Sequence, residues 1–283
     1  MKITKGKIFK VILLLLVGFL AYQFIYGRLI MFSPIVVGFE KQKAENSIVY
    51  YHENNTRVDN KTLDSLILKT EQFHKLEFNQ KVRIFFCNTD KEFKRYTGSS
   101  ARMVTIFGNS IFVSGTATEE RKTNKISFDT YLLHELSHLL IYQNMTFGKA
   151  MNYPQWFLEG VAVFSSNQFG KDGYLTVQGV SKEIKKGNFV QPKDWGTAFS
   201  SKGKTVKDCK VLYKYRFIYA EFGSIIKDLI DTYGQEIFLN LLHQSLKSND
   251  FYTVFKKNYG IEFSEYITEF ERRIKATNNV YKK

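Results

Sequence analysis

One apolar run near the N-terminus constrains this chain more than any other feature of its sequence. From Val11 to Tyr22 every residue is apolar, glycine or aromatic, and apolar side chains continue past Gln23 and Arg28 to Phe32. Read as one helix, this run would rise about 33 Å at about 1.5 Å per residue, enough to cross a hydrocarbon core of about 30 Å. We therefore predict one N-terminal transmembrane helix.

A cleaved signal peptide is the main alternative to an anchor, since a basic segment followed by an apolar one is common to both. We favour the anchor because no pair of small residues two positions apart marks a cleavage site after the run. The cations before the run are Lys2, Lys5, Lys7 and Lys10, whereas Arg28 is the only one from Val11 to Val37. Positive charge stays on the cytoplasmic side, so we expect a single-pass membrane protein whose body is extracytoplasmic.

The composition favours a folded body over a disordered one. The chain has 283 residues, of which 44% are hydrophobic and 16% aromatic, enough for one substantial domain or two modest ones. Its net charge of +14 permits nucleic-acid binding, but the lysines are dispersed and no nucleic-acid motif stands among them. We therefore predict no nucleic-acid partner. An anionic membrane surface and a solvated basic surface both remain open as explanations of the charge.

The two cysteines are too few for a disulfide framework and too far apart in sequence for a thiolate metal site. A bond between Cys87 and Cys209 would suit an extracytoplasmic domain. We interpret both as buried small residues, because the sequence does not bring them within bonding distance.

The first half of the body alternates strands and helices. Residues 33–60 read as a juxtamembrane connector with one short strand at Ile48–Tyr51, and helical spacing of leucines indicates a helix over Lys61–Leu76. The β-branched and aromatic run Lys81–Cys87 predicts a strand. Thr89 and Glu92 then form a capping box that opens another helix.

A predicted β-hairpin completes the sheet region. Ala101–Gly115 turns at Gly108 and Asn109, and its second strand covers Ile111–Ser114. A charged loop, Thr116–Lys125, follows it. Strands first and helices afterwards indicate an α+β fold with a small mixed sheet and a C-terminal helical part.

The chemistry begins on the next predicted helix, Tyr131–Tyr142, which reads Y-L-L-H-E-L-S-H-L-L-I-Y. His134 and His138 are four positions apart, so both imidazoles lie on one face of the helix. In this H-E-x-x-H arrangement the two histidines bind one metal ion, and Glu135 is placed to act on a water. Three titratable groups on an apolar helix need compensation, which a cation supplies.

A second apolar helix supplies the third ligand. Asn152–Ser165 reads N-Y-P-Q-W-F-L-E-G-V-A-V-F-S, with Pro154 suited to a first helical turn and Glu159 alone among apolar residues. Two histidines and one glutamate, with water in the fourth position, are a recurring catalytic zinc set. We therefore predict one Zn²⁺ ion held by His134, His138 and Glu159.

These two motifs resemble the paired H-E-x-x-H and W-x-x-E-G-x-A motifs of gluzincin, or thermolysin-like, zinc metallopeptidases. Glu159 follows His138 by 21 positions, a spacing similar to theirs. The metzincin layout is excluded, because Ile141 and Asn144 stand where its glycine and third histidine would be. One departure is Val163, which replaces an acidic residue often found four positions after the glutamate ligand, so no partner that orients His134 is identified.

The resemblance extends to the C-terminal region, where Tyr219–Gly234 and Phe251–Gly260 look like the helical part of peptidase MA-like proteins. It implies that a tyrosine at such a helix donates to the oxyanion, and we choose Tyr219 over the nearby Tyr213 and Tyr215. It also implies that Ile111–Ser114 is an edge strand that binds an extended peptide, the alternative being an ordinary core strand.

The sequence thus predicts a membrane-anchored zinc metallopeptidase with Glu135 as general base and a peptide or protein as substrate. Its expected divisions are 1–32 (tail and anchor), 33–60 (connector), 61–180 (catalytic α+β part) and 181–283 (lysine-rich loop, then helices). The loop spans Ser181–Lys210 and contains eight lysines, which indicate either a solvated surface or a preference for acidic substrates. The alternative function is a membrane-anchored zinc-fold protein that binds or senses without turnover. No feature indicates the oligomeric state.

Overall fold

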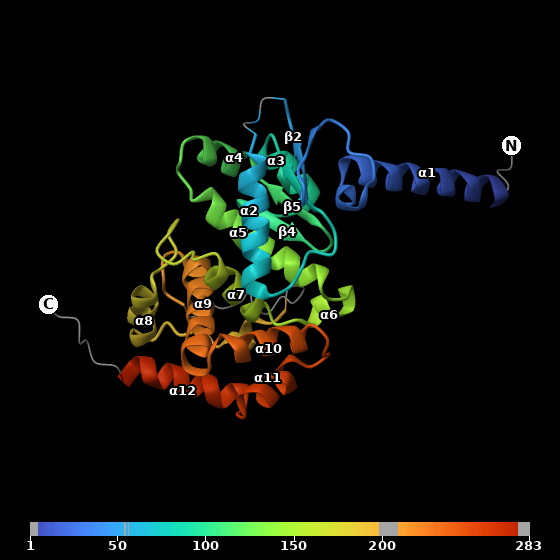
Figure 1. Cartoon of the computed structure of the whole chain (residues 1–283). Helices are drawn as coiled ribbons and strands as arrows, with labels where there is room; N and C mark the ends of the chain where they lie inside the picture. The colour runs from blue at the N-terminus through green and yellow to red at the C-terminus, as the bar shows by residue number, and fades with distance from the viewer. Residues whose placement is uncertain (1–4, 54, 56, 198–208, 277–283) are drawn as a thin grey trace. The chain divides into compact units, whose positions relative to one another are not determined.

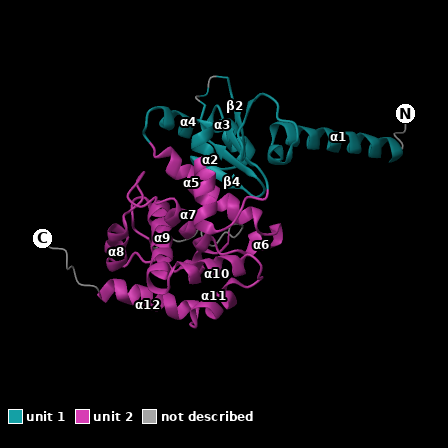
Figure 2. Ribbon diagram, in the orientation of Figure 1, with its two compact units in different colours: residues 1–64, 80–125 teal, residues 65–79, 126–283 magenta. Residues whose placement is uncertain are grey.

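The structure, a computed structural model, describes residues 5–53, 55, 57–197 and 209–276. The chain divides into two compact units (Figures 1 and 2). Unit 1 comprises Met1–Asp64 and Gln80–Lys125, and unit 2 comprises Ser65–Asn79 and Ile126–Lys283. Lys2 and residues 198–208 of the lysine-rich segment lie outside the described residues.

Unit 1 is built on a five-stranded mixed sheet with the strand order β1-β2-β3-β5-β4. The central strands β2, β3 and β5 are parallel, and the outer strands β1 and β4 run antiparallel to their neighbours. The strands are β1 (Glu40–Lys43), β2 (Ser47–Tyr51), β3 (Val82–Phe86), β4 (Met103–Ile106) and β5 (Ser110–Val113). Parallel neighbours need a crossover, and α2 (Asn60–His74) supplies it between β2 and β3.

Several local predictions for unit 1 are confirmed. The strand predicted at Lys81–Cys87 is β3, and the hairpin of β4 and β5 turns at Gly108, whose φ of 127° favours glycine. The Thr89 hydroxyl accepts a hydrogen bond from the Glu92 amide at the start of α3 (Asp90–Thr97). The capping residues therefore begin this helix where the sequence indicates.

Two predictions for unit 1 are wrong. The strand at Ile111–Ser114 is not an edge, because β5 lies between β3 and β4 and its backbone is paired on both sides. The segment Thr116–Lys125 is not a loop, because it contains most of α4 (Gly115–Lys122). The Ser114 hydroxyl caps this helix by accepting from the Ala117 amide, a signal that the charged composition of the segment hides.

The N-terminal helix α1 covers Lys5–Tyr26, so the prediction of a helix to Phe32 is wrong at its C-terminal end. After α1 the chain turns and forms a short 3-10 helix, η1 (Ile30–Phe32), in which Ile30 and Met31 are buried. Those apolar residues belong to the core of unit 1. With 22 residues, α1 is long and apolar enough to cross a membrane, a test that a signal sequence also passes.

Helices are the only regular secondary structure in the described residues of unit 2, apart from one isolated β-bridge between Pro154 and Thr197. It contains the C-terminal part of α2 and eight further α-helices with one 3-10 helix, η2 (Pro192–Trp195). The α-helices are α5 (Phe128–Gln143), α6 (Phe147–Asn152), α7 (Gln155–Ser165), α8 (Val177–Lys185), α9 (Lys214–Tyr233), α10 (Gln235–Ser245), α11 (Phe251–Tyr259) and α12 (Phe263–Ala276).

The closest helix packing in unit 2 joins α7 to α9, which lie side by side in Figure 1. A Cβ atom at Gly160 would lie 2.7 Å from the carbonyl oxygen of Phe222, and one at Gly223 would lie 2.7 Å from Cγ1 of Val163. Only glycine permits such an approach of two backbones. The glycine after Glu159 therefore has a packing role, and Val163 lies against α9.

The fold is α+β, with a small mixed sheet and one N-terminal apolar helix, as the sequence predicts. Residues 33–60 include β1 in addition to the expected strand, and residues 181–210 include the end of α8 and all of η2. The functional divisions at residues 60 and 180 stay predictions. Cys87 and Cys209 are both buried free thiols, which confirms their interpretation as buried small residues.

Candidate metal centre

Helix α5 carries the first three residues of the candidate site. His134, Glu135 and His138 are all buried on this helix, which runs from Phe128 to Gln143 and so begins before the predicted Tyr131. Because residues four apart are stacked one turn above the other, the two imidazole rings face each other edge to face, with centroids 4.7 Å apart. The Nε2 atoms of His134 and His138 are 3.1 Å apart.

Helix α7 brings Glu159 to the two histidines, and α5 and α7 pack together within unit 2. Pro154 is the N-cap residue of α7, one position before the first turn in which it was predicted. Glu159 is buried, and its Oε2 atom lies 3.3 Å from Nε2 of His134 and 3.4 Å from Nε2 of His138. The three predicted ligands are therefore brought together, with their ligand atoms within 4.8 Å of one another.

This group fits a metal ion by its chemistry as well as by its position. Nε2 atoms of two imidazoles and one carboxylate oxygen converge, and Glu159 Oε2 has no hydrogen-bond partner among the described residues. A buried carboxylate oxygen without a donor is costly, and a bound cation offsets that cost. The group is thus able to hold a metal ion, and no other cluster of this kind occurs among the described residues.

The charges in the group are strongly coupled. Desolvation would raise the pKa of Glu159, but His138 and His134 lower it overall. Desolvation would lower the pKa of His138, but Glu159 and Glu135 raise it. The carboxylate therefore stays ionised at neutral pH, which is the state that a metal ligand requires.

A glutamine that the sequence analysis missed orients the carboxylate. The Gln155 side-chain amide donates to Oε1 of Glu159 at 3.3 Å, from one turn earlier on α7. This contact leaves Oε2 directed at the histidines. The Nδ1 atoms of His134 and His138 have no hydrogen-bond partner among the described residues, so the partner that would orient these rings is still not identified.

Several tyrosines lie beside the ligands, and one of them, Tyr142, stacks its ring on that of His138 with centroids 6.4 Å apart. Burial and the charge of Glu159 raise the pKa of Tyr219. Tyr213 and Tyr215 are more than half exposed, so the structure brings only the predicted Tyr219 to the site. Burial and the neighbouring Tyr131 and Glu159 also raise the pKa of Tyr174, which the sequence analysis missed.

The position of Tyr174 depends on a tightly turned loop between α7 and α8. Four residues of this loop, Asn167, Gly170, Asp172 and Gly173, have positive φ angles. The Asp172 carboxylate also accepts a hydrogen bond from the Ser127 amide, next to the start of α5. The glycines at 170 and 173 were the available signal for a turn, but neither predicts which side chain it delivers to the metal centre.

A third buried histidine, His74, holds α5 in place without taking part in the cluster. Its Nδ1 lies 2.8 Å from the Thr70 carbonyl oxygen and therefore donates, so Nε2 accepts from the Ser137 hydroxyl at 2.9 Å. Desolvation by burial lowers the pKa of His74 to about 4. This histidine is a neutral, fully hydrogen-bonded link between α2 and α5.

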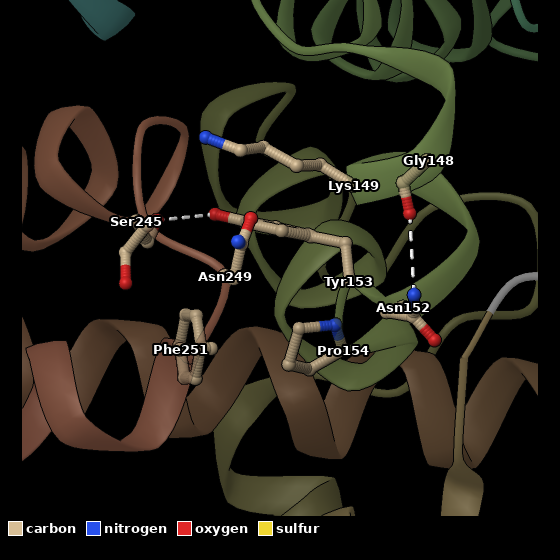
Figure 3. A pocket seen from close by; sticks show the side chains of 9 residues that line it. Gly148, Lys149, Asn152, Tyr153, Pro154, Ser245, Asn249 and Phe251 are labelled. Carbon is tan, nitrogen blue, oxygen red and sulfur yellow. Dashed lines mark hydrogen bonds between the residues drawn. The ribbon is translucent and has the colours of Figure 1, made fainter.

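A separate small pocket of about 80 Å³ lies in unit 2 between α6 and the link from α10 to α11 (Figure 3). Within it the Tyr153 hydroxyl and Ser245 Oγ are 2.5 Å apart, and burial raises the pKa of Tyr153. No metal ligand lines this pocket. Its contacts instead join Tyr153, next to the N-cap of α7, to α10.

Comparison with protein-family models and with curated proteins gave no match for this chain. The function therefore has to be argued from the geometry and chemistry of the centre itself.

Proposed function

We propose that this protein is a zinc-dependent metallopeptidase of the gluzincin type. The observation that carries the proposal is the buried convergence of His134, His138 and Glu159, with Glu135 next to the first ligand on α5. Two histidines and a carboxylate are a recurring ligand set of catalytic zinc, which leaves one position open. The gluzincin motifs on α5 and α7 support this assignment.

Zinc bound by the three ligands would supply a water with a pKa near about 7 and an electrophile that polarises the scissile carbonyl. The chain's own residues supply the proton transfers. Glu135 accepts a proton from the attacking water and returns it to the leaving amine. Gln155 keeps the Glu159 carboxylate oriented, and burial of the group excludes bulk water.

Tyr219 is our candidate donor to the oxyanion of the tetrahedral intermediate. Replacing it by phenylalanine removes one donor, so we expect kcat to fall by about 100-fold with little change in KM. Tyr215→Phe is the matched control, because Tyr215 is on the same helix and 55% exposed. If Tyr174→Phe gives the loss and Tyr219→Phe does not, the donor is Tyr174.

We further propose that α1 anchors the chain and that the body is extracytoplasmic. The support is the length and apolar composition of α1, together with the lysines at its N-terminal end. Protease added to intact cells should cleave the body. Complete protection, with cleavage after lysis, would reverse this topology.

The competing function is a zinc-fold protein that binds or senses without turnover. Glu135 argues against it, because a carboxylate that is not a ligand has no role in merely holding the ion.

The decisive experiment measures zinc content and hydrolysis of a peptide library by the full-length protein in detergent. Wild type should contain about one zinc per chain and cleave peptides, whereas Glu135→Gln should keep zinc and lose at least about 100-fold of the activity. Active zinc-free protein would contradict the proposal. Zinc-loaded protein that cleaves nothing would favour the binding function.

A further inference from the structure

Only a few residues connect the end of α1 to the core of unit 1. Helix α1 ends at Tyr26, where the Gln23 side chain accepts a hydrogen bond from the Arg28 amide. Ile30 and Met31 then enter a buried cluster with residues of the sheet, including Phe85 and Phe112. A flexible tether is therefore absent from these described residues.

A buried arginine fastens this segment to the sheet. Arg83 of β3 donates to the carbonyl oxygens of Met31 at 2.7 Å and Ser33 at 3.2 Å. Its guanidinium also lies 5.3 Å from the centroid of the Tyr50 ring and 5.1 Å from that of Phe85. Charge-assisted hydrogen bonds from a buried guanidinium hold the backbone of η1 in one position.

The C-terminal end of α3 meets the last turns of α1. The Arg28 guanidinium lies within 3.1 Å of the position that a Cβ atom at Gly98 would occupy, next to the end of α3. The Arg95 guanidinium on α3 is already engaged, since it donates to the Tyr96 hydroxyl at 3.1 Å and lies 3.6 Å from Glu92. Arg28 is therefore the exposed cation where the end of α3 meets the end of α1.

Apolar side chains are exposed in the segment that follows α1. Phe32 is 56% exposed, Ile35 67% and Val37 43%, and these residues lie 6, 9 and 11 positions after Tyr26. The whole of α1, Lys5–Tyr26, rises about 33 Å, which matches a hydrocarbon core of about 30 Å. The segment directly after a helix that spans this core therefore begins in the interfacial layer.

We propose that Phe32, Ile35 and Val37, with Arg28, form a membrane-seating surface that rests in the interfacial layer of an anionic bilayer. The apolar side chains enter the boundary between headgroups and acyl chains, and the Arg28 guanidinium meets anionic headgroups. This inference rests on the proposal that α1 crosses the membrane. It adds that unit 1 lies directly against the lipid.

The test uses the full-length protein in vesicles of phosphatidylcholine and phosphatidylglycerol. Phe32→Cys and Ile35→Cys are labelled singly with an environment-sensitive fluorophore, and lipids with a nitroxide near the headgroup serve as quenchers. The control is Glu119→Cys on α4, an exposed site of unit 1 far from α1 in Figure 1. The unmodified parent measures background labelling of the buried Cys87 and Cys209.

We expect the lipid quencher to lower emission from positions 32 and 35 at least about twofold more than emission from position 119. Ile35→Cys keeps the test valid if Phe32→Cys misfolds, because Ile35 is the more exposed. Arg28→Gln should reduce the quenching in anionic vesicles and leave it unchanged in purely zwitterionic ones.

Three results would overturn the inference, and they are distinguishable. Protein that is washed from vesicles by alkali has no spanning anchor, which removes the premise. Anchored protein with equal quenching at positions 35 and 119 has a spanning helix, but its membrane-seating surface does not contact lipid. A label at position 35 that is shielded from iodide in water and also from the lipid quencher is covered by protein instead of lipid.

Discussion

The three buried histidines of unit 2 differ in what their ring nitrogens contact. His74 has both nitrogens hydrogen-bonded, one to the Thr70 carbonyl and one to the Ser137 hydroxyl. His134 and His138 direct Nε2 at each other and at a carboxylate, and their Nδ1 atoms have no partner among the described residues. The first is the ordinary state of a core histidine. The pair is arranged for a ligand, so burial alone does not identify a metal site.

The largest expected effect comes from replacing a ligand histidine, and it is measured against the replacement of the core histidine His74. His134→Asn removes a predicted ligand, so zinc should be lost and peptide hydrolysis should fall by more than about 100-fold, beyond the usual cost of losing an outer partner. His74→Asn is the matched control on α2 and should keep zinc. Equal zinc loss in both variants, with both still folded, would contradict the distinction between a ligand histidine and a core histidine.

Zinc removal should lower the thermal stability only when the centre of His134, His138 and Glu159 is intact. A metal that binds only the folded state at a free concentration of about 1,000 times its Kd stabilises the protein by about 4 kcal/mol. We expect a chelator to lower the Tm of wild type and added zinc to restore it. Glu159→Gln should show no response to either, as measured by thermal unfolding followed by circular dichroism. A full response in that variant would place the metal elsewhere.

His74 predicts a loss of stability in acid. Its pKa is about 4 in the folded state, against an ordinary value of 6.5, because burial disfavours the charged ring. The stabilisation is complete above pH 6.5 and is lost as the pH falls towards 4, by about 2 kcal/mol at about pH 5 and roughly 3 kcal/mol in total.

Urea unfolding of metal-free wild type and His74→Gln, at about pH 7 and about pH 5, measures this loss. The free energy of unfolding should fall more between the two pH values in wild type than in His74→Gln. Metal-free protein is used so that zinc release does not contribute. Identical pH dependence of the two proteins would show that His74 is not held neutral.

The smallest effect should follow Ser137→Ala, which leaves Nε2 of His74 buried without its donor. We expect a loss of about 1 to 2 kcal/mol in the free energy of unfolding, with zinc content unchanged. Ser181→Ala is the control, because its hydroxyl bonds only to Val177 of its own helix. Loss of zinc in Ser137→Ala would mean that the two histidine environments are coupled.

The sequence was informative where a polar group interrupts an apolar helix. Helical spacing places His134 and His138 on one face, and each needs a partner in such a setting. Glu159 was predicted as the third ligand from its apolar helix and from the resemblance to the gluzincin motifs. The hairpin at Gly108 and the cap at Thr89 were predictable for a similar reason, because each depends on residues only a few positions apart.

Contacts between distant segments that carry no motif were not predictable. Tyr174 reaches the centre through a loop with several positive φ angles, which no periodicity describes. Arg83 is in a strand, where a charged side chain usually indicates a solvated face, yet it is buried against the carbonyls of Met31 and Ser33. The order of β3, β5 and β4 depends on parallel pairing between distant strands, and it overturns the edge strand expected from resemblance.

Zinc-edge X-ray absorption on the zinc-loaded full-length protein tests the ligand set most directly. The account predicts two imidazole nitrogens and oxygen ligands, all at about 2.0 to 2.2 Å. A zinc–sulfur distance of about 2.3 Å would instead implicate Cys87 or Cys209, and a third imidazole would implicate another histidine such as His74. Either result would contradict a centre built from His134, His138 and Glu159.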